Sequence, residues 1–274
     1  MTHIKGIFLA ATAALLVTAV ADAQFVATEK EVRRQDRVQW LYKKRHVPIV
    51  ADERVQNYAR CIFNRVLAEL PPETKEEYGD LEWEVIVFDE DSINAGADSN
   101  GKIELYSELL QVAETQDALA AVIGHELAHV TQGHTMERAR KMARQEVWST
   151  LGGAVTGSTE MARQALFIGL ALPFVREHET EADLVGLDYM AKAGFDPRAA
   201  VYLWKAMAAA HAAEEGKNRQ AEFLRTHPTD SVRLNDIASS LGPALATYNA
   251  AREAGKRPNC SIATAATGTR TGTR

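Results

Sequence analysis

The sequence has 274 residues, of which 46% are apolar and 25% are charged, and its formal net charge is -6. This composition is typical of an ordinary globular protein with one good core or two small ones. The acidic balance argues against a general nucleic-acid-binding protein, which needs a basic face to neutralise phosphates, so no nucleic acid is expected among the partners.

The N-terminus predicts an export signal. Residues 1–5 carry Lys5 and no acid, residues 6–20 are apolar, and Ala21-Asp22-Ala23 is a small-x-small cleavage site. The apolar run of about 15 residues is short for a bilayer core of ~30 Å, which favours a cleaved signal peptide over a membrane anchor. We therefore expect residues 1–23 to be removed on export.

The first half of the chain predicts two helices and a small sheet. Residues 29–46 have a helical pattern in which Val32, Trp40 and Leu41 can face inward. A second helix over residues 52–70 ends at Pro71-Pro72. The expected strands are residues 83–88 and a hairpin over residues 94–106, whose turn is Asp98-Ser99-Asn100-Gly101.

The second half is predicted to be helical. One helix runs from about residue 115 to 145, and glycines at 152, 153 and 157 mark a loop or a loosened helix. Another covers residues 161–193, with a kink at Pro173 and a stop at Gly194. Asp196-Pro197 begins the next helix, and the last helix covers about residues 230–241. The fold class is therefore mainly α with a small β-sheet or hairpin (α+β), with one domain over residues 24–254 and a disordered tail over residues 255–274.

The chain has two cysteines, Cys61 and Cys260. Export permits a disulfide between them, which would tie the C-terminal tail to an early helix. Two free thiols are the alternative, and the sequence does not decide between them. Their spacing excludes a CxxC metal or redox motif.

The chemistry is concentrated in His125-Glu126-Leu127-Ala128-His129. Two histidines four residues apart on a helix share one face and can bind one cation. Glu126 lies beside them, where it can act as general base toward a metal-bound water. The helix is apolar around the motif, and unpartnered buried histidines are costly, so a surface helix with two ordinary histidines is disfavoured.

A third ligand is available downstream. The same-segment zinc pattern would need Gly at position 132 and His at position 135, where this chain has Gln132 and Thr135. Glu179 and Asp183 are four residues apart on the helix about 50 residues further on, whereas Glu181 points away from their face. Glu179 could therefore be the third metal ligand, while Asp183 orients one of the metal-binding histidines. The alternative is a solvated acidic helix face.

Three further polar residues have open roles. His227 is either a structural histidine or a donor near the metal, which steadies the oxyanion or occupies the open metal position in a resting state. Arg233 could act similarly or pair with an acid such as Asp183, and its alternative is a solvated helix residue. His134 is interpreted as structural.

The stretches from His125 to His134 and from Arg176 to Asp183 together resemble peptidase family M48, and the resemblance extends from about residue 50 to 240. This chain is similar to the small exported branch of bacteria within that group. The resemblance implies a mainly helical HExxH zincin fold of the gluzincin type over residues 24–254. It also implies one zinc ion (Zn2+) bound by His125, His129 and Glu179, with Glu126 catalytic.

The resemblance implies a zinc-dependent metalloendopeptidase acting by Glu126-assisted attack of a zinc-bound water. The expected partners are protein or peptide substrates, including unfolded or unassembled proteins of the cell envelope, in quality control in the periplasm of a Gram-negative bacterium. Substrate could add as a strand along the edge formed by residues 102–106. The apolar run 165–175 is too short to span a bilayer and leaves peripheral membrane contact as an expectation.

A rival function from another class is a zinc-bound chaperone or assembly factor of the envelope with latent or gated protease activity. The sequence does not exclude it, because an intact HExxH motif can be closed to substrate. A purely structural zinc site is disfavoured, since three ligands leave the fourth position open.

Overall fold

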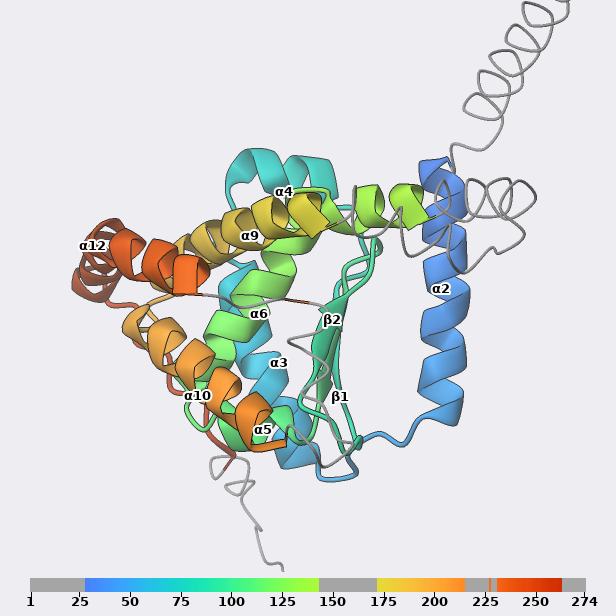
Figure 1. The fold of residues 1–274 in the computed structure, drawn as a ribbon, viewed down its shortest axis with the longest axis horizontal. Helices are drawn as coiled ribbons and strands as arrows, with labels where there is room; N and C mark the ends of the chain where they lie inside the picture. Colours follow the sequence, from blue (N-terminus) through green and yellow to red (C-terminus); the bar gives the residue numbers. More distant parts are fainter. Residues whose placement is uncertain (1–27, 143–171, 215–226, 228–230, 263–274) are drawn as a thin grey trace, which may run out of the picture. The chain divides into compact units, whose positions relative to one another are not determined.

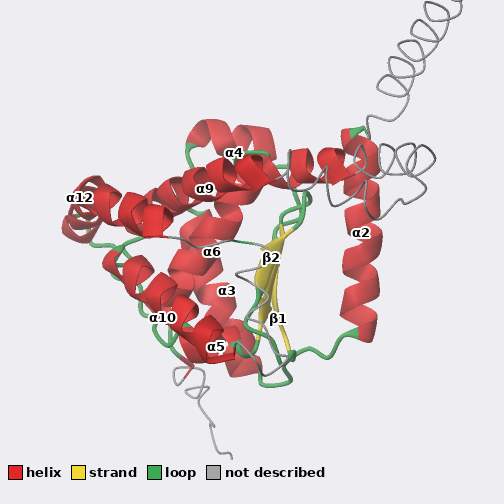
Figure 2. Ribbon diagram, in the orientation of Figure 1, coloured by secondary structure: helices red, strands yellow, loops and turns green. Residues whose placement is uncertain are grey.

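The computed structural model describes residues 28–142, 172–214, 227 and 231–262. The expected signal peptide (1–23), the glycine-marked loop (152–157) and the first part of the helix expected over residues 161–193 lie outside the described residues. Among the described residues, residues 36–135 and those from 175 onward form one compact unit, and residues 28–35, 136–142 and 172–174 belong to another. The site described below lies in the first of these units, which is mostly helical with one small sheet (Figure 2).

The sheet has three strands in the order β1-β3-β2. β1 (Glu84–Phe88) runs parallel to β3 (Lys102–Tyr106), which also pairs antiparallel with β2 (Ala95–Ala97). The predicted hairpin is confirmed, but the expectation that residues 102–106 form an edge is wrong. The sequence pattern of β3 cannot reveal that β1 pairs on its other side, because that contact is set by the tertiary fold.

Helices cover both faces of the sheet (Figure 1). α2 (Glu29–His46) has the predicted bounds, and its Trp40 packs on Ile86 and Phe88 on one face. Trp40 and Val32 are buried as expected, whereas Leu41 is 60% exposed. One residue turns a helix by about 100°, so Leu41 cannot share the buried face of Trp40.

The other face of the sheet carries the main core. α3 (Glu53–Leu67) packs on β1, and α6 (Gln116–Thr131) packs on β2 and on α3. The N-caps of both helices are formed by side chains: Asp52 accepts from the Arg54 amide, and Thr115 accepts from the Ala118 amide. Two short helices, α4 (Pro72–Tyr78) and α5 (Leu109–Val112), were not predicted. Pro72, which was predicted to end the preceding helix, also begins α4. It stands in the first turn of that helix, where proline is tolerated.

α6 ends earlier than predicted. Gly133 adopts a φ of 73°, and its amide donates to the Val130 carbonyl, which stops the helix at Thr131. Residues 134–142 are helical again after this turn. The single helix expected over residues 115–145 is therefore wrong, because the helical period of the apolar residues continues across the turn while the backbone does not.

Three long helices complete the described fold. α9 (Leu172–Lys192) is followed by Gly194 at φ 84°, which confirms the predicted stop. Asp196 accepts from the amide of Arg198 at the start of α10 (Arg198–Glu214), which packs against α6 and α12. α12 spans Ser231–Glu253 and extends past the predicted end, with Pro243 inside it. Its Ala244 and Ala251 are buried, so packing outweighs the hydrogen bond that Pro243 removes.

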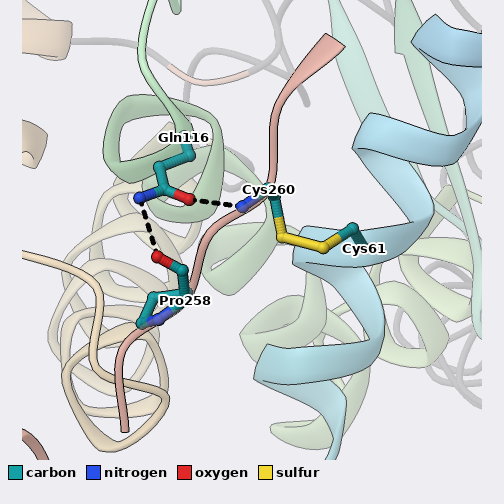
Figure 3. Close-up of a disulfide and its surroundings, with 4 residues drawn as sticks. All are labelled: Cys61, Gln116, Pro258 and Cys260. Atoms are coloured by element: carbon teal, nitrogen blue, oxygen red, sulfur yellow. Dashed lines mark hydrogen bonds between the residues drawn. A yellow bond between two sulfur atoms is a disulfide. The ribbon is translucent and has the colours of Figure 1, made fainter. Parts of the chain in front are cut away.

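The C-terminal segment is tied to the core (Figure 3). Cys61 in α3 forms a disulfide with Cys260. The Gln116 side chain, at the start of α6, accepts from the Cys260 amide at 2.9 Å and donates to the Pro258 carbonyl at 3.1 Å. The disorder expected from composition therefore does not apply to residues 255–262, while residues 263–274 lie outside the described residues.

None of the helices in the described ranges is both long enough and apolar enough to cross a membrane.

Candidate metal centre

α6 places two histidine side chains on one buried face. Every residue from Ala118 to Thr131 is buried, because α6 lies between the sheet, α3 and α10. His125 Nε2 and His129 Nε2 lie 3.0 Å apart, as their spacing of four residues predicts. Two unprotonated ring nitrogens so close can share one cation.

α9 approaches α6 closely through two glycines. A Cβ atom on Gly124 would lie 2.7 Å from the Gly186 carbonyl oxygen, and a Cβ on Gly186 would lie 2.7 Å from the His125 amide nitrogen. These distances are too short for any side chain. The backbone contact brings Glu179 of α9 to both histidines: its carboxylate oxygens lie 3.4 Å from His125 Nε2 and 3.3 Å from His129 Nε2.

His227 supplies a fourth donor. Its Nδ1 lies 2.9 Å from Glu179 Oε2 and 3.2 Å from His125 Nε2. One donor atom from each of His125, His129, Glu179 and His227 lies within 4.8 Å of the others, and all four residues are buried. Nitrogen and carboxylate donors in this number and spacing can hold a metal ion.

Glu126 lies at the edge of the donor cluster. It is 1% exposed, and its Oε1 is 3.6 Å from His227 Nε2. That oxygen has no hydrogen-bond partner among the described residues. A buried carboxylate oxygen without a hydrogen-bond donor is costly. A bound ligand or water is therefore the expected partner of Glu126 Oε1.

Asp183 and Arg233 support the cluster from the side of His125. Asp183 Oδ1 lies 2.9 Å from His125 Nδ1, the nitrogen that faces away from the other donors. Arg233 Nε donates to Asp183 Oδ2 at 2.6 Å, and its guanidinium lies 4.0 Å from the Trp204 ring centre. Arg233 also contacts Glu179 Oε2 at 3.0 Å and the His227 carbonyl at 3.2 Å. The solvated alternative for Arg233 is wrong, because the residue is 4% exposed.

A further histidine, His134, contacts the ring nitrogen of His129 that does not face the donor cluster. His134 Nδ1 is 3.1 Å from His129 Nδ1, and His134 Nε2 is 3.2 Å from Glu181 Oε2. The His178 ring stacks on His134 at 3.9 Å with an interplanar angle of 11°. Glu181 points away from the donor cluster, as its position in α9 predicts, and contacts His134 instead.

The charges of the cluster favour a cation. Burial opposes a charged His125, but hydrogen bonds and charges from Asp183 and Glu179 outweigh it and raise the pKa of His125 to about 9. Burial lowers the pKa of His129 well below its ordinary value. Burial also opposes a charged Glu179, but the histidines around it hold its pKa well below the ordinary value. The carboxylates therefore stabilise one positive charge among the donors.

The formal charge fits a divalent ion. The buried charged groups of the donor cluster and its supports are three carboxylates (Glu126, Glu179 and Asp183) and one guanidinium (Arg233), so their formal charge is minus two. With neutral histidines, a divalent cation balances this charge, and an isolated excess of buried negative charge would be costly. The residues present thus fit a bound divalent metal.

The structure brings together every metal-site residue that the sequence indicates: His125, Glu126, His129, Glu179, Asp183, His227 and Arg233. Cys61 and Cys260 lie elsewhere, in the disulfide. The contributions of Trp204, His178, Gly124 and Gly186 were missed, because each depends on packing between different helices. Gly124 stands next to His125, and a glycine inside a predicted helix beside a motif was the one available signal of close packing.

Comparison with known proteins gives consistent matches. The sequence model of Peptidase family M48 matches residues 54–240. Mitochondrial metalloendopeptidase OMA1 of Schizosaccharomyces pombe is 36% identical over 169 residues, which cover 60% of this chain and 48% of that protein. The beta-barrel assembly-enhancing protease of Escherichia coli is 31% identical over 167 residues, covering 55% of this chain and 32% of that protein. The matched part of this chain thus spans about half or less of these relatives.

Proposed function

The chain belongs to peptidase family M48, and from this premise we propose that it is a zinc-dependent endopeptidase. The observation that carries the proposal is the buried cluster of four donor atoms beside Glu126 Oε1, which accepts no hydrogen bond from the described residues. His125, His129 and Glu179 would hold the metal. Three nitrogen and carboxylate ligands of this kind are the usual set of a catalytic zinc.

Zinc, when bound, would supply Lewis acidity that makes water a nucleophile at neutral pH and polarises the substrate carbonyl. Glu126 would accept a proton from the water while the water oxygen bonds to the carbonyl carbon of the substrate. The carbon–nitrogen bond then breaks, and Glu126 would deliver that proton to the amine that leaves. Glu126 Oε1 is buried beside the donor cluster and accepts no hydrogen bond from the described residues, which supports this role.

His227 occupies the position of a fourth donor. A catalytic zinc needs one position for water, so we propose that the arrangement with His227 among the donors is a resting state. On leaving that position, the imidazole could donate to the oxyanion of the tetrahedral intermediate. Its Nε2 already lies 3.6 Å from Glu126 Oε1, so a small movement would keep it near the reacting atoms.

β2 is the sheet edge nearest the site, since it packs on α6. The Tyr106 amide donates to the Asn94 carbonyl, and the Asp98 amide donates to the Lys102 carbonyl. Ala95 and Ala97, between these bonded positions, therefore direct backbone groups away from β3. The Ala95 amide donates to Asn94 Oδ1 at 2.9 Å, so a substrate would pair mainly with the Ala95 carbonyl and with Ala97. We propose that an extended substrate segment pairs with this edge. Main-chain hydrogen bonds would hold the segment, so binding would depend little on the amino-acid sequence of the substrate.

We propose that the substrates are proteins of a bacterial cell envelope and that the chain acts in the periplasm. The Escherichia coli relative is named for enhancing β-barrel assembly, and β-barrels of this kind belong to outer membranes. The predicted signal at residues 1–23 supports export. The OMA1 relatives are named as mitochondrial, which supports the peptidase chemistry without supporting the compartment.

The test compares metal content and casein cleavage of the wild type with those of Glu126→Gln. We expect about one zinc in both proteins and a loss of cleavage of about 100- to 10,000-fold in the variant, because a general base contributes that much. Zinc in both with equal cleavage would remove Glu126 from the mechanism. In the same assay, His227→Ala would raise basal cleavage if His227 blocks the metal, and would lower it if His227 serves the oxyanion.

The chaperone alternative is separated by complementation. If Glu126→Gln restores the phenotype of a deletion strain fully, binding without proteolysis is the function. Loss of complementation with zinc retained supports proteolysis.

A further inference from the structure

His134 and Glu181 link the candidate metal centre to the surface, and the proposed function does not use them. His134 is 2% exposed and lies between His129, at 3.1 Å, and Glu181, at 3.2 Å. The Glu181 side chain is 54% exposed. His129, His134 and Glu181 thus form a continuous line of polar contacts, here called the His129 relay.

The positions of the protons in the relay follow from metal binding. A neutral imidazole carries one hydrogen, so His129 can bind a metal through Nε2 only if the hydrogen is on Nδ1. That N–H faces His134 Nδ1, which must then accept it. His134 therefore carries its own hydrogen on Nε2, where the carboxylate of Glu181 accepts it. Each contact has one donor and one acceptor in this arrangement.

We propose that His134 is a positioning residue that holds His129 in the tautomer and orientation that bind the metal, and that Glu181 fixes the tautomer of His134. The proposal rests on the proposed metal site. A ligand histidine generally donates its second N–H to a fixed acceptor, and loss of that acceptor weakens metal binding. Here the acceptor is an imidazole, with the carboxylate one step further away.

The local structure holds His134 in place for this role. On a continuous α-helix, residue 134 would lie about 140° around the axis from residue 129. The turn at Gln132–Gly133 ends α6 and returns the His134 ring to His129. The stacked ring of His178, the neighbour of Glu179 in α9, fixes the plane of the His134 ring. The same helix thus carries Glu179, Glu181 and the stacking partner.

The test is the zinc dissociation constant of the purified full chain, measured by competition with a chromophoric chelator. His134→Phe keeps the ring and its stacking surface but has no acceptor. We expect it to weaken zinc binding about 10- to 100-fold. In His134→Gln, the amide oxygen can accept from His129 and the amide N–H can donate to Glu181, so affinity should return toward the wild type. Thermal unfolding of the metal-free proteins checks that the variants fold.

A second measurement reads the tautomers in the wild type. Nitrogen-15 NMR of the histidine-labelled, zinc-loaded chain should show His134 with a hydrogen on Nε2 and none on Nδ1. The opposite tautomer of His134, or zinc binding by His134→Phe as tight as in the wild type, would overturn the proposal. A wild type that binds no zinc would overturn the proposed function itself, and the His129 relay with it.

Discussion

His125 and His129 stand one turn apart on α6 and have the same requirement, an acceptor for the Nδ1 hydrogen, yet the protein meets it in two ways. His125 faces the carboxylate of Asp183 directly at 2.9 Å, and Asp183 is held by the buried Arg233. His129 faces the neutral ring of His134, and its carboxylate, Glu181, is half exposed.

The two supports differ in whether water can take the place of a lost side chain. The side chains of Asp183 and Arg233 are 3% and 5% exposed, so removing one leaves the other charged and without solvent. A buried charge without its partner is strongly destabilising. At Glu181, water can take the place of the carboxylate, and an exposed ion pair contributes only about 0–1 kcal/mol. The effect of mutating the residues that support each histidine therefore depends more on how buried those residues are than on the chemistry of the acceptor.

The largest effect is expected where both histidines lose their α9 partners together. Gly124→Ala places a Cβ where the Gly186 carbonyl lies, which forces α6 and α9 apart. We expect zinc affinity to fall more than 100-fold, beyond the range for losing a single supporting contact, and overpacking to cost about 1–3 kcal/mol. Calorimetric zinc titration and urea unfolding measure the two quantities.

Gly242→Ala is the matched control for that substitution. Gly242 lies in α12, and a Cβ there would meet no atom within 4 Å. We expect zinc binding to be unchanged and stability to be equal or up to about 1 kcal/mol higher, since alanine is the better helix former. A tight zinc site in Gly124→Ala would show that the glycine contact does not set the position of α9.

The next effect isolates the support of His125. Asp183→Asn keeps the size of the side chain but leaves Arg233 without its main counter-ion. We expect a loss of about 3–5 kcal/mol in unfolding free energy and about 10- to 100-fold in zinc affinity. Urea unfolding of the metal-free chain measures the first effect separately from the second. A loss below 1 kcal/mol would contradict the importance assigned here to burial.

The smallest effect belongs to the exposed end of the His129 relay. Glu181→Gln should change zinc affinity by at most about fivefold, the equivalent of 1 kcal/mol, because the site is half exposed. Glu177→Gln is the control, since Glu177 is an exposed carboxylate one turn earlier in α9. Equal losses in both variants would assign the effect to the charge of the helix. A loss as large as that of Asp183→Asn would contradict the comparison between the two histidines.

Much of the site was predictable because it depends on local spacing. The four-residue intervals from His125 to His129 and from Glu179 to Asp183 fix which side chains share a helix face, whatever the helix packs against. Helix caps such as Thr115 and Asp196 are local in the same way, and so is the hairpin turn at residues 98–101. The face shared by His125 and His129 and the face shared by Glu179 and Asp183 could accordingly be anticipated from the sequence. The role of His227 as a fourth donor and the pairing of Arg233 with Asp183 were only one interpretation each, because both depend on contacts between distant segments.

Other features could not be predicted from spacing. His134 lies near His129 only because Gly133 ends the helix, and a helical pattern read through the glycine points His134 elsewhere. β3 has a strand on each side because β1 pairs with it in parallel, a contact between segments separated by a loop and another strand. α12 continues through Pro243 because packing of Ala244 and Ala251 offsets the lost hydrogen bond.

The sequence by itself determined the kind of chemistry: which residues can bind a metal, which can act as a base, and which helices carry them. Only the tertiary structure decided how each ligand is supported, because the acceptors of the two histidines come from another helix and from beyond a turn. Donor type and helical period are properties of short segments, whereas burial and the close contact of Gly124 with Gly186 arise only when distant segments pack.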